Sequence, residues 1–237
     1  MGALVIVVTL SLLAVWLAYA LPSAQPARVP ASAAQPTFAE RAAVDRRVVV
    51  AIVEGVELLL PVSLEATTAI GYHPVDNADT VPFSPRGERV AGGSLAQRLA
   101  DVFAGGGGLQ YYLMDGDDND LSSSTAALDV GAVPGAEVFS PVAGKVVSLR
   151  RTEISGRYQD VELQIQFAAD PSLLLVVTHL ARPGVKLGDT VAQGESLLGR
   201  VRAYPSAIEQ ELSRYTSDAG DHVQFVVLRV TPEIAGL

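Results

Sequence analysis

The sequence predicts a mainly β protein with a small α+β extension toward its N-terminus and a transmembrane helix at its start. From residue 125 onward, short β-branched runs alternate with glycine and proline turns, a pattern typical of strands. Residues 2–21 form an apolar run without any charge. Four segments are therefore expected: a transmembrane anchor or signal segment at 1–21, a Pro/Ala-rich linker at 22–37, the α+β extension at 38–120 and a β-domain at 121–237.

The composition limits the function classes that need to be considered. The 237 residues, 49% of them hydrophobic, are enough for one or two small domains with real cores. The formal net charge is −9 and there is no basic run, so no nucleic-acid partner is expected. The absence of cysteine excludes disulfides and thiolate metal sites. Any conventional zinc site must draw on the only three histidines, His73, His179 and His222.

The apolar run at 2–21 is long enough to cross a bilayer as a helix. It is apolar on every side, which disfavours a buried core helix. We expect a single-pass anchor in the cell membrane with the bulk of the chain outside the cytoplasm. Secretion after signal cleavage is the alternative, because Ala18-Tyr19-Ala20 offers a small-x-small cleavage pattern. The arginines that follow the run argue against this orientation under the positive-inside rule.

The extension at 38–120 combines expected helices and strands. Capping-box pairs, Thr37 with Glu40 and Ser94 with Gln97, predict two short helices, the second over 94–103. Residues 48–64 predict one or two strands, with a break at a glycine or a proline.

Residues 71–86 resemble a loop, because they contain three prolines and several turn-forming residues. His73 lies in this segment and is interpreted as a surface histidine, although a metal-binding role is the alternative.

The β-domain is justified by its strand patterns. Residues 160–167, "DVELQIQF", alternate between apolar and polar side chains. Residues 172–181 predict a buried strand that ends at His179, and residues 183–201 predict tight turns between short strands. Ser206 and Glu209 predict a capped helix over 207–215. The stretch "DHVQFVV" predicts a late strand on which His222 and Gln224 face the same side.

The order of "ALDVGAVPGAEVFSPVAGKVV", "THLARPGVKLGDTVAQGESLLGRV" and "DHVQFVV" resembles the lysostaphin-type (LytM-type) zinc endopeptidases over roughly residues 121–232. Those enzymes cut peptidoglycan cross-links. The resemblance implies a barrel-sandwich hybrid with a duplicated hybrid motif. In the family, a histidine, an aspartate four residues later and the last histidine of a His-x-His pair hold zinc. A strand histidine and the first histidine of the pair assist catalysis.

Carried over position by position, the match is partial. Asp129 stands at the ligand aspartate, whereas Thr125 and Gln224 stand where the two ligand histidines belong. His179 and His222 match the two assisting histidines. Threonine and glutamine oxygens are poor donors for zinc, so Asp129 is expected to be a vestigial ligand and the two histidines vestigial assisting groups. A turn-forming role before Gly131 is the alternative for Asp129.

The resemblance implies an exported, membrane-anchored protein with a degenerate, non-catalytic endopeptidase-like domain. It would bind peptidoglycan or an envelope protein partner, or regulate a wall hydrolase, without a cofactor. One alternative is an active zinc metallo-endopeptidase with altered ligands, in which Asp129, His179 and His222 form a rearranged metal site. The other is a purely structural β-domain of the envelope.

Overall fold

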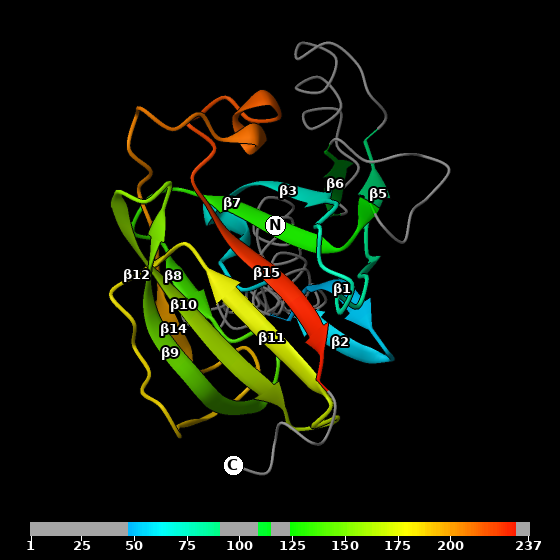
Figure 1. Cartoon of the computed structure of the whole chain (residues 1–237). Coiled ribbons are helices and arrows are strands. Elements are labelled where there is room, and N and C mark those ends of the chain that lie inside the picture. The colour runs from blue at the N-terminus through cyan, green and yellow to red at the C-terminus, as the bar shows by residue number, and fades with distance from the viewer. Residues whose placement is uncertain (1–46, 91–108, 115–123, 231–237) are drawn as a thin grey trace, which may run out of the picture. The chain divides into compact units, whose positions relative to one another are not determined.

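The computed structural model describes residues 47–90, 109–114 and 124–230, all of which fall within one compact unit. The described strands form a nine-stranded sheet in the order β13-β9-β10-β11-β15-β7-β3-β6-β5 and two three-stranded sheets, β2-β1-β4 and β12-β14-β8. Most of these strands are labelled in Figure 1. The mainly β character expected from the sequence is therefore confirmed. The apolar run at 2–21, the linker at 22–37 and the helices expected at Thr37 and over 94–103 lie outside the described residues. Within the described ranges, no helix has the length and apolar character needed to cross a membrane.

The strand bounds are as follows. The large sheet contains β13 (Thr190–Val191), β9 (Gly144–Ile154), β10 (Tyr158–Phe167), β11 (Leu173–Thr178), β15 (His222–Arg229), β7 (Ala127–Ala132), β3 (Thr67–His73), β6 (Gln110–Leu113) and β5 (Glu88–Arg89). The small sheets contain β2 (Val56–Leu59), β1 (Val49–Val53), β4 (Ser84–Pro85), β12 (Leu180–Ala181), β14 (Leu197–Val201) and β8 (Glu137–Phe139). Two 3-10 helices, η1 (Leu64–Ala66) and η2 (Glu211–Arg214), complete the described elements.

Local patterns explain the hairpins. β1 and β2 are joined at Glu54 and Gly55, both of which have a positive φ that a tight turn requires. The alternation in "DVELQIQF" becomes β10, in which Leu163, Ile165 and Phe167 are buried. β10 pairs with β9 on one side and with β11 on the other, so its apolar face packs into the core.

Two expectations about local structure are wrong. The helix expected over 207–215 is reduced to η2, because Gln210 adopts an extended conformation and the N–H groups of Ser213 and Tyr215 bond to carbonyls three residues back. The segment at 71–86 is not a loop throughout, because residues up to His73 belong to β3 and pair with β7.

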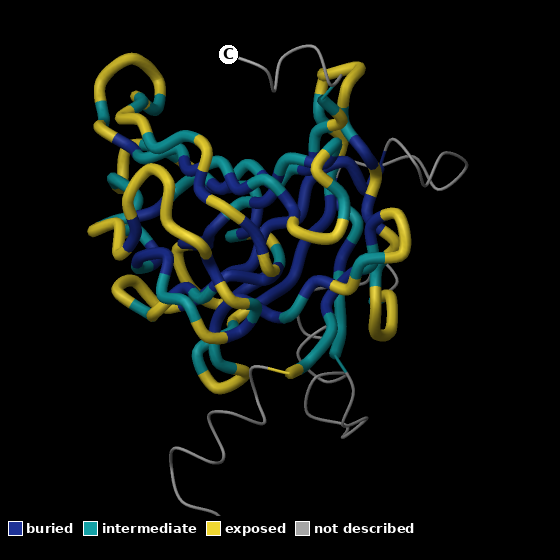
Figure 2. Tube along the Cα trace, turned by 90° about the horizontal axis from the view of Figure 1, so that it is seen from below, coloured by how far each residue is buried: buried dark blue, intermediate teal, exposed yellow. Residues whose placement is uncertain are grey.

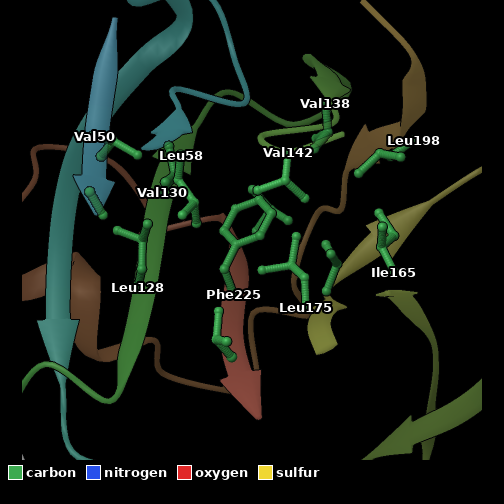
Figure 3. Packing of buried hydrophobic residues seen from close by; sticks show 14 of the residues in the cluster. Val50, Leu58, Leu128, Val130, Val138, Val142, Ile165, Leu175, Leu198 and Phe225 are labelled. Atoms are coloured by element: carbon green, nitrogen blue, oxygen red, sulfur yellow. The ribbon is translucent and has the colours of Figure 1, made fainter. Parts of the chain in front are cut away.

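The extension and the β-domain share one core. β3 pairs antiparallel with β7, and β6 pairs parallel with β3, so the large sheet continues from one segment into the other. Figure 3 shows Val50 and Leu58 from the first strands close to Leu128, Val130 and Phe225, and all five belong to the same buried cluster. Figure 2 shows the buried residues in the middle of the described chain and the exposed residues on its loops. The described part of 38–120 therefore packs onto the β-domain.

Candidate functional site

A row of residues crosses the centre of the large sheet. Asp129 on β7 lies opposite Gln224 on β15, and Gln224 lies opposite Thr178 on β11. On the other side, Asp129 lies opposite Gly71 on β3. Directly paired residues project from the same face of a sheet, so the strand order brings the predicted site residues Asp129 and Gln224 together.

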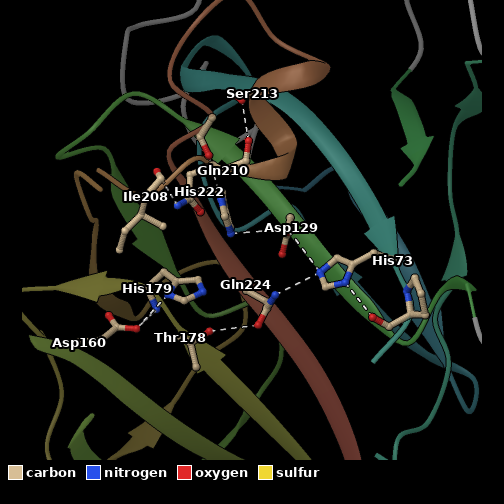
Figure 4. A network of polar contacts seen from close by, with 12 residues as sticks. His73, Asp129, Asp160, Thr178, His179, Ile208, Gln210, Ser213, His222 and Gln224 are labelled. Carbon is tan, nitrogen blue, oxygen red and sulfur yellow. Dashed lines mark hydrogen bonds and ion pairs between the residues drawn. The ribbon is translucent and has the colours of Figure 1, made fainter. Parts of the chain in front are cut away.

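Asp129 lies between two histidines. Its Oδ2 atom is 3.4 Å from Nε2 of His73 and 3.5 Å from Nε2 of His222. Figure 4 shows the two rings on either side of the carboxylate, one contributed by β3 and the other by β15. The interpretation of His73 as a surface histidine is therefore wrong: the pairing of β3 with β7 places it beside Asp129, with a side chain that is 19% exposed.

Backbone carbonyls orient both rings. Nδ1 of His73 lies 2.9 Å from the carbonyl oxygen of Pro74, and Nδ1 of His222 lies 2.9 Å from that of Gly220. A carbonyl oxygen only accepts hydrogen bonds, so each Nδ1 carries the hydrogen and donates it. Each Nε2 therefore faces Asp129.

The three groups influence one another electrostatically. Burial raises the pKa of Asp129, but the charge of His222 and the hydrogen bond and charge of His73 lower it, and the net shift is downward. Burial lowers the pKa of His73, but its hydrogen bond and ion pair with Asp129 outweigh this and raise it. The carboxylate is therefore ionised at neutral pH, and its negative charge is compensated within the protein.

Gln224 provides a second partner for His73. The two Nε2 atoms are 3.1 Å apart, so the amide donates to a neutral His73 ring. When His73 is protonated, the same ring nitrogen donates to Asp129 instead. The oxygen of Gln224 accepts from the hydroxyl of Thr178 at 3.4 Å.

His179 belongs to a second carboxylate pair, which the sequence analysis missed. Asp160 on β10 accepts hydrogen bonds from the backbone N–H of His179 at 3.2 Å and from its Nδ1 at 2.9 Å. Its other oxygen accepts from Arg202 at 3.2 Å. Burial raises the pKa of Asp160, but the bond and charge of His179, followed by smaller effects that include Arg202, lower it overall. Asp160 does not correspond to any of the site positions of the family. The pairing of β10 with β11 is what brings it to His179.

Tyr204 covers His179 and His222. Its ring stacks on His222 with centroids 5.3 Å apart and contacts His179 edge-on at 5.1 Å. The rings of His179 and His222 are themselves 5.2 Å apart. Asp221 fixes the position of Tyr204 by accepting its backbone N–H at 2.6 Å. Burial, and then the charges of Asp129 and Asp160, raise the pKa of the phenol, which keeps its proton at neutral pH.

Among the described residues, three buried polar atoms in this network have no hydrogen-bond partner: Oδ1 of Asp129, the hydroxyl of Tyr204 and Nε of Arg202. Each is a place where a water molecule or a polar ligand atom can bind, because burying a polar atom without a partner is costly. No sequence signal marks Tyr204 apart from its being an aromatic residue directly before a proline.

Thr125 does not join the row across the sheet. It lies two residues before β7 begins, and its carbonyl accepts the N–H of Phe83. Thr125 also lines a separate pocket of about 360 Å³ together with Phe83 and Tyr111. Of the three positions that the family uses for zinc, only Asp129 therefore carries a charged donor into the site.

Of the three positions that the family uses for zinc, only Asp129 supplies a strong donor here, because Thr125 and Gln224 are neutral, whereas a catalytic zinc ion takes three strong donors. The carboxylate of Asp129 is flanked instead by His73 and His222 and faces the amide of Gln224. Throughout residues 47–90, 109–114 and 124–230, no three or more His, Asp or Glu side chains are grouped so that they could hold a metal ion.

Comparison with known proteins gives structural matches only. No family model matches the chain, and no curated protein matches it. Lysostaphin matches with 16% identity and a TM-score of 0.36 over 51% of this chain and 43% of that one, so the chain spans less than half of lysostaphin. A putative M23 peptidase from Pseudomonas aeruginosa matches with 20% identity and a TM-score of 0.31, covering 78% of this chain and 86% of that one.

The SpoIIQ–SpoIIIAH pore-forming complex also contains a matching chain, with 17% identity and a TM-score of 0.32, covering 71% of this chain and 91% of that one. The chain therefore has structural matches to lysostaphin, to an M23 peptidase and to a chain of the SpoIIQ–SpoIIIAH complex.

Proposed function

We propose that this chain is an exported, membrane-anchored protein whose β-domain binds a peptide of the cell wall, or of an envelope partner, without cutting it. The observation behind the proposal is that Asp129 lies between two histidines. Its Oδ2 atom is 3.4 Å from Nε2 of His73 and 3.5 Å from Nε2 of His222. Asp129 is the one anionic residue at the ligand positions of the family, and its carboxylate pairs with two histidines of the protein itself.

The physical reason is charge compensation. A buried carboxylate is costly unless positive charge and hydrogen bonds compensate it. In a zinc peptidase the metal supplies that charge and also activates water. Here two imidazoles and an amide of the protein itself surround Asp129 and stabilise its charged form. The neutral residues Thr125 and Gln224 add no anionic donor.

Binding without cleavage is supported by what remains at the site. Asp160 and Arg202 hold His179 in a fixed orientation, and Tyr204 lies over the histidines. Hydroxyl, imidazole and guanidinium groups recognise amides and carboxylates, which are the polar groups of wall peptides and of protein partners.

The anchoring and the location rest on the sequence. Residues 2–21 are uncharged and apolar, and the proline-rich linker follows them. Protease added to intact spheroplasts should degrade the β-domain while a cytoplasmic control protein survives. Complete protection of the β-domain would contradict an extracytoplasmic location.

The central experiment measures metal, cleavage and binding on the same purified chain. We expect less than stoichiometric zinc, no digestion of cross-linked muropeptides, and co-sedimentation with insoluble peptidoglycan or with an envelope partner. A chain that sediments with neither would instead be a structural β-domain. One zinc per chain with muropeptide cleavage, both lost in Asp129→Ala, would establish the active metallo-endopeptidase with altered ligands.

A further inference from the structure

A pocket of about 430 Å³ lies directly beside the pair formed by Asp160 and His179. β9, β10, β12 and the residues that follow β14 form its walls. Arg151, Gln159 and Arg202 give it a polar wall, while Val161 and Leu180 line its apolar part. This volume is in the range of pockets that bind small ligands, and it holds a few atoms of a peptide end or side chain.

The charges of the pocket favour an anion. Arg151 and Arg202 carry two positive charges against the single negative charge of Asp160, in a chain whose net charge is −9. The carboxylate of Asp160 is already occupied, because it accepts from His179 at 2.9 Å and from Arg202 at 3.2 Å. The excess positive charge is therefore available to a ligand.

Several donors of the pocket are unused. Within the described residues, Arg151 and Gln159 are exposed and their side chains form no hydrogen bond or ion pair. Nε of Arg202 is buried and also has no partner there. A guanidinium presents several N–H groups in one plane and matches the two oxygens of a carboxylate.

We propose that this pocket binds the carboxylate group of a peptide, held by Arg151 with Gln159 and Arg202 beside it. The inference rests on the proposed peptide-binding function and names the group that is recognised. Binding at the pocket is transmitted to the site, because Arg202 and His179 bond to opposite oxygens of Asp160. The ring of His179 therefore reports on occupancy of the pocket.

The test titrates the purified full chain at low salt with three probes. N-acetyl-D-alanyl-D-alanine presents a terminal carboxylate, its C-terminal amide presents none, and N-acetylglutamate α-amide presents a side-chain carboxylate. Calorimetry gives the affinity. Histidine ring NMR gives the location, because the chain has only three histidines. We expect at least one carboxylate probe to bind about tenfold more tightly than the amide and to shift the His179 signals. The carboxylate probe that binds more tightly shows whether the pocket prefers a terminal or a side-chain carboxylate.

Arg151→Gln is the decisive variant, because Arg151 is exposed and its loss leaves the fold intact. It should weaken carboxylate binding about tenfold and abolish the preference over the amide. Arg157→Gln, an exposed arginine in the turn of the same hairpin, is the matched control and should bind like wild type. Equal binding of acid and amide, binding of no probe, or an unchanged Arg151→Gln variant would overturn the proposal.

Co-sedimentation with peptidoglycan, measured in parallel, separates the two proposals. If wild type sediments with peptidoglycan but binds no probe, the pocket inference fails and the proposed function stands. If the chain cleaves muropeptides, the proposed function fails, while the preference for carboxylate over amide still decides the pocket inference.

Discussion

Asp160 determines how His179 is presented, in both its backbone and its ring. His179 has a φ of +65°, a left-handed conformation that costs a non-glycine residue about 1–2 kcal/mol. Asp160 offsets this by accepting the backbone N–H at 3.2 Å and the ring N–H at 2.9 Å. Its side chain is 3% exposed and also pairs with Arg202, so the carboxylate is strongly held in its ionised form.

Asp160→Asn should destabilise the protein by about 2–3 kcal/mol near neutral pH, because an amide replaces a charged acceptor of several hydrogen bonds. The pKa of Asp160 is lowered in the folded chain, so its contribution is present above the ordinary carboxyl pKa and is lost as pH falls through the folded value. Urea unfolding from pH 3 to pH 8 should give a difference between wild type and variant that shrinks in acid. Glu153→Gln, on the same hairpin and exposed, should show almost no difference. Parallel stability curves for wild type and Asp160→Asn would contradict the prediction.

The family resemblance grouped Asp129 with His222 and Gln224, and strand periodicity placed the last two on one face. Asp129 and Gln224 meet because they are opposite each other on paired strands, and His222 lies near both on the same strand as Gln224. His73 was misjudged, because the turn-forming residues after it obscured the strand that it ends. Asp160 and Tyr204 were not identified, because no local pattern states which distant strand or loop will lie beside a histidine.

At the scale of elements, β3 contributes a histidine, His73, at a position that the family pattern does not include. Its pairing with β7 places Nε2 of His73 3.4 Å from Asp129 and 3.1 Å from the amide of Gln224. Two ligand atoms on a tetrahedral zinc ion are about 3.3 Å apart, given bonds of 2.0–2.1 Å. His73 and Asp129 are therefore spaced like zinc ligands, and position 224 lies where a third donor is needed.

Gln224→His alone should therefore create a zinc site, without the Thr125→His change that the family pattern suggests. We expect about one zinc per chain by elemental analysis after dialysis against excess zinc and removal of unbound metal. Adding His73→Ala should abolish the binding, whereas adding Thr125→Ala should leave it intact. Zinc retention in the His73→Ala background would place the ligands elsewhere.

η2 shows a second effect at this scale. Leu212 is fully buried over β3 and β7, where Gly71 and Gly131 leave room for it. A Cβ added at Gly131 would lie 2.8 Å from Cδ2 of Leu212 and 2.8 Å from the hydroxyl of Thr68. The capping pattern of Ser206 and Glu209 predicted a longer helix than the 3-10 turn that forms, and it did not indicate where Leu212 would pack.

Gly131→Ala should cost about 1–3 kcal/mol through overpacking, and Leu212→Ala about 2–4 kcal/mol through the cavity that it leaves. The double variant should lose at least about 1 kcal/mol less than the sum of the two, because Leu212→Ala removes one of the clashes. Denaturant unfolding of the four proteins measures this coupling. Strict additivity would show that Leu212 does not pack against Gly131.

At the scale of the whole molecule, the resemblance to endopeptidases begins near residue 121, but the large sheet does not. β3 and β6 extend the sheet beyond β7, and Ile70 and Tyr72 are buried in the same cluster as Leu128 and Val130. The hydroxyl of Tyr72 donates to the carbonyl of Val50 at 2.9 Å, which ties β3 to the first hairpin. Local patterns predicted several strands, among them β1, β2, β10, β11 and β15, but not β3 or β6. The order of strands in the sheet depends on long-range pairing that periodicity does not encode.

A chain of residues 121–237 alone should therefore fail to fold stably. Without β3, the edge of β7 is unpaired and Leu128 and Val130 lose neighbours from the extension, so apolar surface and backbone groups become exposed. We expect poor NMR dispersion and a broad thermal transition for 121–237, against sharp cooperative unfolding for 38–237. Adding the fragment 38–120 in trans should restore dispersion if β3 pairs as described. A cooperative, well-dispersed 121–237 fragment would show instead that the β-domain is independent and that β3 merely docks onto it.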